Sequence, residues 1–211
     1  MSRAGLTRAK IADAALTLID EIGIDAFSMR KLGQHLGVDP MAIYRHFQHR
    51  EDLFDAVAEL LFDHIDVNAL PWNGRWRDLA GQYCQALLSV LQEHPHAVTT
   101  FATRPIRSNS SISSGVRMIE CFVAGGFSPE NSLRVARSLR ELTIGHALSL
   151  SAVQLGSQTR SRKPAPEDPN YNLLAKAADS AGIDDHFDIA LTAMLDGFEN
   201  LRESAASAAA G

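Results

Sequence analysis

Apolar side chains recur along most of the chain at spacings of three and four residues, which places them on one face of a helix. The clearest stripe consists of Ile11, Ala15, Leu18, Ile19 and Ile22. With Thr7 as a capping residue, this stripe predicts a first helix from about Thr7 to Glu21. No stretch alternates β-branched and polar residues over the length of a strand, so the pattern predicts an all-α protein.

Glycine and proline residues mark where the predicted helices end. Gly23 follows the first helix, and Ser28 can cap a second helix that runs to about Leu36. Further helices are expected at about 40–47, 51–65, 75–93, 95–102, 106–124, 128–155, 170–181 and 184–203. Residues 156–169 are expected to form a mobile loop, and residues 204–211 a frayed tail.

The segment from Met29 to Gln48 has the features that a helix-turn-helix requires. Gly33 supplies a small residue where the two helices cross, and Gly37 supplies a residue that tolerates a left-handed backbone in the turn. Ile43 supplies the apolar side chain that faces inward from the second helix. The segment therefore predicts a DNA-binding motif, and the alternative is an αα-hairpin within an ordinary helical core.

With Ile43 facing inward, its neighbours face outward, where a recognition helix in the major groove contacts DNA. Arg45 suits a guanine edge, and Met41 or Ala42 suits a thymine methyl group. Four further side chains suit phosphate contacts: Tyr44, His46, Arg30 and Arg50. The alternatives are a Tyr44 packed under the helix, a merely solvated His46, and an N-terminal arm with Arg3 and Arg8 that adds contacts or is inert.

The distribution of charge changes how the composition is interpreted. The whole chain of 211 residues has a formal charge of −5, which argues against a protein that coats nucleic acid without selectivity. Residues 1–50 carry seven basic and five acidic side chains, a charge of +2, so the acidic excess of −7 belongs to the remaining 161 residues. The basic segment coincides with the predicted helix-turn-helix.

Other kinds of chemistry find little support in the sequence. No nucleophile elbow or phosphate-binding glycine loop is present, so we expect no enzyme and no cofactor. His94 and His96 form either a zinc-binding pair or a solvated surface pair. Neither cysteine lies near them in the sequence, which favours the solvated surface pair. Cys84 and Cys121 suit buried, reduced thiols, and with no visible signal or membrane segment they suggest a cytoplasmic protein.

A break at residues 70–74, with Pro71 and Gly74, suggests two domains. We assign residues 1–66 to a helix-turn-helix domain that includes the connecting fourth helix, and residues 67–211 to a larger helical domain.

Two groups of residues carry a resemblance to a known family. The run from Gly23 to Gly33, with Leu36-Gly37-Val38, Ile43-Tyr44-Arg45-His46-Phe47 and Leu53, resembles the DNA-binding domain of the TetR family of bacterial repressors. A looser similarity joins the rest of the chain to the ligand-binding domain of the tetracycline repressors. It rests on Trp76, Asp78, Thr103-Arg104-Pro105, Gly126-Phe127-Ser128 and Thr143-Ile144-Gly145.

This resemblance implies a homodimer that binds a palindromic DNA operator and is released by a small-molecule effector. It also implies that the dimer interface is a four-helix bundle made by the helices at about 128–155 and 184–203. The broad apolar face of the last helix suits both a core and a partner. The alternatives are a regulator of the same fold that activates or acts without an effector, and an unrelated helical enzyme or scaffold.

The resemblance also implies a ligand pocket in the larger domain. His64, Thr103 and Arg104 match positions beside the drug in the tetracycline repressors, whereas Tyr83, Thr100 and Ser149 replace an asparagine, a magnesium-binding histidine and an acidic residue of the partner subunit. We therefore expect no metal site and no binding of magnesium-tetracycline, but another effector. The candidate lining is His64, Tyr83, Leu87, Phe101, Thr103, Arg104, Met118, Phe122 and His146.

Overall fold

The computed structural model describes residues 5–156, 171–180 and 186–210, and every regular element in these ranges is a helix. The helices are α1 (Arg8–Ile22), α2 (Met29–Leu36), α3 (Pro40–Tyr44), α4 (Arg50–Asp63), α5 (Trp76–Glu93), α6 (Val98–Thr103), α7 (Asn109–Ala124), α8 (Pro129–Gln154), α9 (Tyr171–Ser180) and α10 (His186–Ala210). The predicted all-α class is therefore confirmed. None of these helices is both long and apolar enough to cross a membrane.

Most helix starts follow from the capping residues in the sequence. The Lys10 amide donates to Thr7 Oγ1 at 3.3 Å, and the Lys31 amide donates to Ser28 Oγ at 3.2 Å, which confirms both predicted caps. Ser108 caps α7 in the same way, so this helix begins at Asn109, later than the position near 106 that the sequence predicts.

Two helix ends differ by three residues or more from the predicted ones. The predicted third helix extends to Phe47, but α3 ends at Tyr44 because the chain turns tightly there, with the amides of His46 and Phe47 both donating to the Ile43 carbonyl. The last helix, α10, continues to Ala210 through an alanine-rich segment where the sequence predicts a frayed tail. The predicted mobile loop at 156–169 lies outside the described residues from residue 157 onward.

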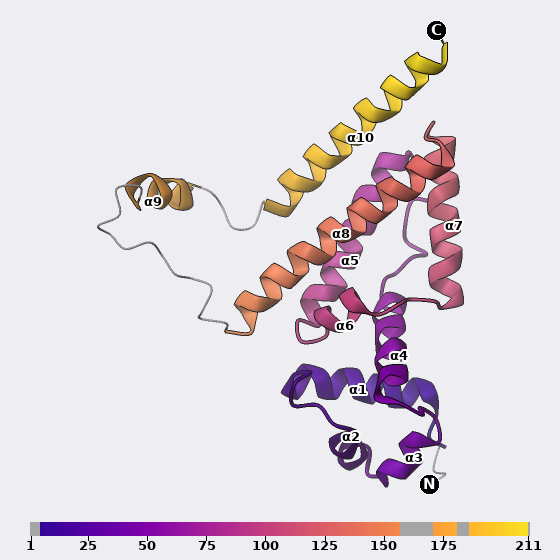
Figure 1. Cartoon of the computed structure of the whole chain (residues 1–211), viewed down its shortest axis with the longest axis vertical. Helices are drawn as coiled ribbons and strands as arrows, with labels where there is room; N and C mark the ends of the chain where they lie inside the picture. Colours follow the sequence, from indigo (N-terminus) through magenta and orange to yellow (C-terminus); the bar gives the residue numbers. More distant parts are fainter. Residues whose placement is uncertain (1–4, 157–170, 181–185, 211) are drawn as a thin grey trace.

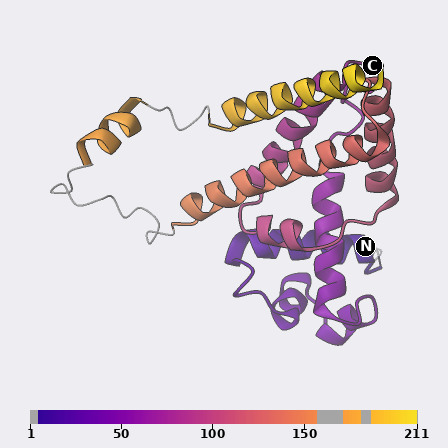
Figure 2. The same ribbon diagram turned by 45° about the horizontal axis from the view of Figure 1, so that its top comes forward.

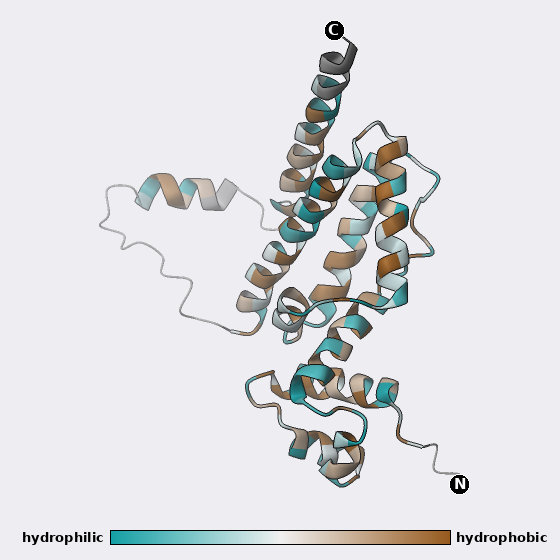
Figure 3. Cartoon of the chain, turned by 45° about the vertical axis from the view of Figure 1, so that its right-hand side comes forward, coloured by the Kyte–Doolittle hydropathy of each residue, from teal (hydrophilic) through white to brown (hydrophobic). Residues whose placement is uncertain are grey.

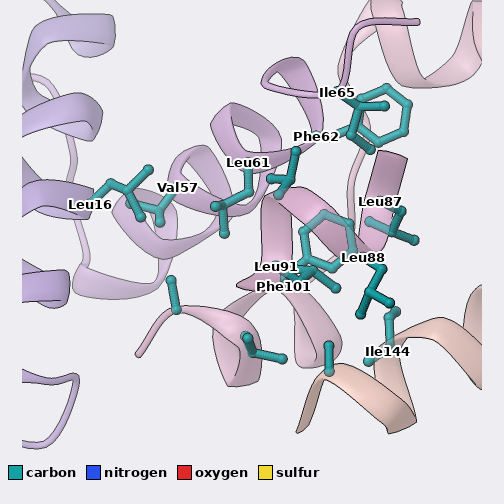
Figure 4. Close-up of a cluster of buried hydrophobic side chains, with 14 of the residues drawn as sticks. Leu16, Val57, Leu61, Phe62, Ile65, Leu87, Leu88, Leu91, Phe101 and Ile144 are labelled. Atoms are coloured by element: carbon teal, nitrogen blue, oxygen red, sulfur yellow. The ribbon is translucent and has the colours of Figure 1, made fainter. Parts of the chain in front are cut away.

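The first three helices form a small unit that is joined to the rest of the molecule by α4 (Figure 1). We call the unit formed by α1, α2 and α3 the head. Its core contains Ile11, Ile19, Leu32, Ile43 and Phe47, all fully buried. The helix α4 packs against α1 at one end and against α6 and α7 further along. Figure 4 shows this continuity, from Leu16 and Val57 through Leu61 to Phe101 and Ile144.

The remaining helices form a larger bundle above the head. The helix α5 packs between α7 and α8, and α10 lies beside α8, whereas α9 stands apart from the bundle (Figures 1 and 2). At one end of the bundle, Trp76 packs edge-on against Phe122 and Phe127. Figure 3 shows that hydrophobic residues also occur on the outer side of α7, where Ile112 and Val116 are exposed.

Candidate nucleic-acid interface and ligand pocket

The turn between α2 and α3 is built from a short run of local hydrogen bonds. Gly37 has a φ of +67°, the left-handed conformation predicted for it, and ends α2. The Val38 amide donates to the Gly33 carbonyl at 2.9 Å. Asp39 then caps α3 by accepting from the Met41 amide at 2.7 Å, and Pro40 occupies the first helical position. These bonds fix the direction in which α3 leaves α2.

Gly33 allows the turn to lie close against α2. A Cβ at this position would come within 3.0 Å of the Val38 carbonyl oxygen and 3.1 Å of Pro40 Cγ. Any side chain here would therefore push Pro40, and with it the start of α3, away from α2. The close approach that the sequence predicts for Gly33 involves the turn and the first residue of α3.

The outer face of α3 presents the side chains that the sequence assigns to base contacts. Ile43 is fully buried, whereas Met41 is 66% and Tyr44 41% exposed. Arg45, just after the helix, is exposed, and Ala42 and His46 are half-buried. Tyr44 is therefore not packed beneath the helix, and the Met41, Tyr44 and Arg45 side chains are accessible to a partner.

The arginines near this face fall into two kinds. Arg30 and Arg45 are exposed, and neither forms an ion pair with any residue in the described part of the chain. Arg50, the first residue of α4, is instead held against the head, because it donates to the Ile24 carbonyl at 3.1 Å and its guanidinium lies 4.7 Å from the centre of the Phe54 ring. Arg50 therefore stabilises the start of α4. A phosphate that bound Arg50 would have to share its guanidinium with the Ile24 carbonyl and the Phe54 ring.

Arg8 is a residue whose position the sequence did not indicate. Its guanidinium donates to the His46 carbonyl and stacks 4.0 Å from the centre of the Phe47 ring. Arg8 thus fastens the start of α1 to the end of α3, next to the exposed Arg45. Only its positive charge was visible in the sequence, because its partners are 38 residues or more away.

The predicted ligand pocket is divided by the packing of the larger domain. Leu87, Phe101 and Phe122 are fully buried, and Met118 is 6% exposed, so these four side chains belong to the core. Tyr83 is also buried, and this burial raises its pKa to about 12. These side chains are therefore packed against other core residues and do not line an open cavity.

A hollow of about 350 Å³ lies at the edge of this packed region. Two predicted pocket residues, Tyr83 and Arg104, line it together with Phe62 and Arg140. Arg104 pairs with Asp55 of α4 at 3.4 Å, and Arg140 lies 5.4 Å from the centre of the Phe101 ring. This hollow thus combines a phenol, two guanidinium groups and apolar walls.

The three remaining pocket residues lie elsewhere. Thr103 is exposed and donates to the Thr99 carbonyl at 2.8 Å. His64 is exposed at the end of α4. His146 packs against Phe187 of α10, with ring centres 5.1 Å apart, and burial lowers its pKa. These three side chains do not converge with Tyr83 and Arg104.

The residues at the matching metal position do not fit a magnesium ion. Thr100 is 2% exposed, and its hydroxyl has no hydrogen-bond partner in the described part of the chain. In the described ranges, no group of three or more histidine, cysteine or acidic side chains is placed so that it could hold a metal ion. A lone buried hydroxyl supplies too few oxygen ligands for a hard cation.

The histidines that follow α5 are not a solvated pair, contrary to the favoured interpretation of the sequence. His94 Nδ1 lies 2.7 Å from Asp20 Oδ2 of α1, and His94 is only 18% exposed. The hydrogen bond to Asp20 raises the pKa of His94 against the opposing effect of burial. His96 is half-buried and packs against Gly23, where a Cβ would come within 3.3 Å of its Nδ1. Both side chains therefore lie between the head and the larger bundle.

Comparison with known families matches the chain over most of its length. The family described as "Bacterial regulatory proteins, tetR family" matches residues 11–57. The family described as "Tetracyclin repressor-like, C-terminal domain" matches residues 70–202.

Individual relatives are similar to nearly the whole chain. Tetracycline repressor protein class D from Escherichia coli is 30% identical over 207 residues, which cover 93% of this chain and 90% of that protein. A possible TetR family transcriptional regulator from Streptomyces coelicolor superposes with a TM-score of 0.81, at 25% identity, over 92% of this chain and 99% of that one. A variant of TetR from Acinetobacter baumannii in complex with minocycline gives a TM-score of 0.76 at 25% identity, covering 93% and 95% of the two chains.

Proposed function

The chain belongs to the TetR family of bacterial transcriptional regulators, and on that premise we propose that it is a repressor that binds a palindromic operator as a homodimer. The head reads the DNA, and a small-molecule effector bound to the larger domain releases it. Members of this family are regulators and not enzymes.

The exposed face of α3 is the observation that carries this proposal. Met41, Tyr44 and Arg45 are exposed on or next to a helix whose start is fixed by the turn at Gly37 and whose end is fastened by Arg8. A helix that is held in this way can present the same side chains to successive base pairs in a major groove. Arg45 is the residue that we assign to a base, and Arg30 to a phosphate.

The homodimer is supported by the arrangement of α8 and α10. The two helices lie side by side, and each keeps large apolar side chains exposed, among them Leu133 on α8 and Leu201 on α10. Covering such side chains with the same helices of a second copy removes apolar surface from water. Two heads would then present a basic surface to two successive half-sites of the operator.

We place the effector in the hollow beside Tyr83, Arg104 and Arg140, which in volume is at the lower end of the usual range of ligand sites, about 300–1,000 Å³. The Asp55–Arg104 pair links this hollow to α4, which also packs against α1 in the head. A ligand that displaces Arg104 would therefore act on the helix that positions the head.

The dense packing of Leu87, Phe101 and Phe122 favours a second candidate, a regulator of the same fold that acts without an effector in this domain. The two candidates differ in a direct way. A thermal-shift screen of small molecules should find at least one compound that stabilises the first kind of protein and also releases DNA, and none for the second.

The DNA-binding proposal is tested by selecting bound fragments from random double-stranded DNA and measuring affinity by fluorescence anisotropy at several salt concentrations. We expect an enriched palindrome and an affinity that falls steeply with salt, because phosphate contacts release counterions. The absence of any enriched sequence, or an affinity that is insensitive to salt, would overturn the proposal.

Arg45→Ala tests the assignment of the reading residue. We expect a loss of about 1–3 kcal/mol on the selected palindrome and a smaller loss on random DNA, since a base contact contributes only at its cognate base pair. Arg107→Ala, at an exposed arginine of the larger bundle, is the matched control and should leave both affinities unchanged. Equal losses on both DNAs would make Arg45 a phosphate contact.

A further inference from the structure

A groove of about 910 Å³ lies at the end of the larger bundle that is farthest from the head. The start of α5, the second half of α7 and α10 form its walls. None of the residues predicted to line the ligand pocket contributes to it. Its volume falls within the range of about 300–1,000 Å³ that is usual for small-molecule sites.

Both tryptophans of the chain line this groove, and both are held in place. Trp72 Nε1 donates to the Val67 carbonyl at 2.7 Å, and Trp76 Nε1 donates to Glu199 Oε2 at 3.1 Å. Gly125 permits the close approach of Trp76 to α7, because a Cβ there would come within 2.9 Å of the indole. The groove therefore has two fixed aromatic rings in its walls.

Three of the four arginines in the groove already have acidic partners. Arg75 pairs with Asp78 at 2.9 Å, and Arg77 pairs with Asp196 at 2.6 Å. Arg202 lies against Glu199 at 2.5 Å. These three guanidinium groups are therefore already paired with carboxylates, and Glu120 adds one further carboxylate to the groove lining.

Arg117 is the exception. Its guanidinium lies 4.2 Å from the centre of the Trp72 ring, and within the described ranges no carboxylate is close enough to form an ion pair with it. Stacking on an indole orients a guanidinium while leaving its N–H groups free along the edge. The groove thus contains one exposed guanidinium, that of Arg117, whose N–H donors are held in a fixed orientation beside the Trp72 indole.

We propose that this groove binds a small aromatic carboxylate, with its carboxylate on the Arg117 guanidinium and its ring beside the half-buried Trp72, whereas Trp76 is only 6% exposed. A single uncommitted guanidinium matches a single carboxylate through two parallel hydrogen bonds. Indole walls favour a flat ring over an aliphatic chain of similar size. The site is separate from the hollow beside Tyr83, and its existence does not depend on DNA binding.

The fluorescence of Trp72 and Trp76 provides a local measurement, because the chain has no other tryptophan. We would titrate the full-length protein with benzoate, following tryptophan emission and, in parallel, the heat of binding. Benzyl alcohol retains the ring without the charge, and cyclohexanecarboxylate retains the charge without the aromatic ring. We expect saturable binding of benzoate and at least about tenfold weaker binding of both comparators, as the loss of a charged hydrogen bond or of ring stacking implies.

Arg117→Met removes the charge but keeps a long apolar side chain over Trp72. We expect it to weaken benzoate binding at least about tenfold, whereas the matched control Arg107→Met leaves binding unchanged. A second measurement needs no variant: bound benzoate should slow the alkylation of Cys121, which lies in the groove wall, but not of Cys84, which is fully buried. Equal affinity for benzoate and benzyl alcohol, binding that Arg117→Met leaves intact, or unprotected Cys121 at saturating benzoate would each overturn the proposal.

Discussion

His94 Nδ1 and Asp20 Oδ2 lie 2.7 Å apart, although 74 residues separate them in the sequence. Asp20 belongs to α1 in the head, and His94 follows α5 in the larger bundle. The pair is mostly shielded from water, and Asp20 Oδ1 is buried without a hydrogen-bond partner in the described ranges. A positive charge on one imidazole therefore strengthens a contact between the two parts of the molecule.

This pair predicts a dependence of stability on pH. The pKa of His94 is raised in the folded protein above its ordinary value of 6.5, chiefly by the hydrogen bond to Asp20. The stabilisation is therefore fully present below about pH 6.5 and is lost as the pH rises through the raised pKa. We expect His94→Gln to lower the free energy of unfolding by about 1–2 kcal/mol near pH 6, and by less near pH 9. Urea denaturation at several pH values measures this difference.

The exposed His186 provides the control for that experiment, because it has no acidic partner within the described part of the chain. Near pH 6, His186→Gln should lower the free energy of unfolding by less than His94→Gln does. Other titratable groups near His94 are Glu93 and His64, and the ring centre of His64 lies 5.4 Å from that of His94. A pH dependence that persists in His94→Gln would assign the effect to these neighbours.

Substituting Gly37 should change stability through the backbone conformation alone, without any change in side-chain packing. Its φ is +67°, yet no atom lies within 4 Å of the place where a Cβ would stand. Gly37→Ala should therefore lower the free energy of unfolding by about 1–2 kcal/mol through backbone strain alone. Gly37→Asn should lose less, because asparagine tolerates this conformation. Equal losses for the two variants in urea denaturation would contradict this explanation.

Leu87 distinguishes a packed interior from a ligand cavity. It is fully buried, so Leu87→Ala should lower the free energy of unfolding by about 2–5 kcal/mol. Leu173→Ala, at a side chain that is 74% exposed, is the matched control and should change stability by less than about 0.5 kcal/mol. A loss below about 1 kcal/mol for Leu87→Ala, measured by thermal or urea unfolding, would indicate that Leu87 faces open space.

The chemistry around Thr100 predicts how the protein responds to the drug of its relatives. We expect anhydrotetracycline with magnesium to leave the melting temperature unchanged, because a lone hydroxyl replaces the required metal ligands. The class D repressor from Escherichia coli, which is 30% identical, serves as the comparison protein in the same assay. A melting temperature that rises with drug concentration would show that the pocket retains a metal-drug site.

Local sequence patterns were sufficient to predict the fold and much of the face that we propose to read DNA. Helix caps such as Ser28, the left-handed turn at Gly37 and the inward Ile43 depend on residues within one or two turns of each other. The exposure of Met41 and Arg45 then follows from helical geometry. These features could be predicted because their causes are close together in the chain.

The contacts that connect distant segments were not predictable in this way. Nothing in the helical periodicity pairs Arg8 with Phe47, Arg50 with Ile24, or His94 with Asp20. Pocket residues are hard to predict for a different reason, because an apolar side chain such as Phe101 has the same sequence signature whether it fills a core or lines a cavity. Only packing in three dimensions separates these two cases.

The continuous core along α4 restricts how this protein can be re-engineered. Leu61 and Val57 lie on one helix, yet their neighbours come from both the head and the bundle (Figure 4). A chimaera that joins this bundle to the head of another regulator would therefore place the junction between the two proteins inside a packed core. Exchanging α1 to α3 alone would leave α4 facing foreign partners. A workable graft would move the outer surface of α3 and keep Leu16, Val57 and the Asp20–His94 pair together.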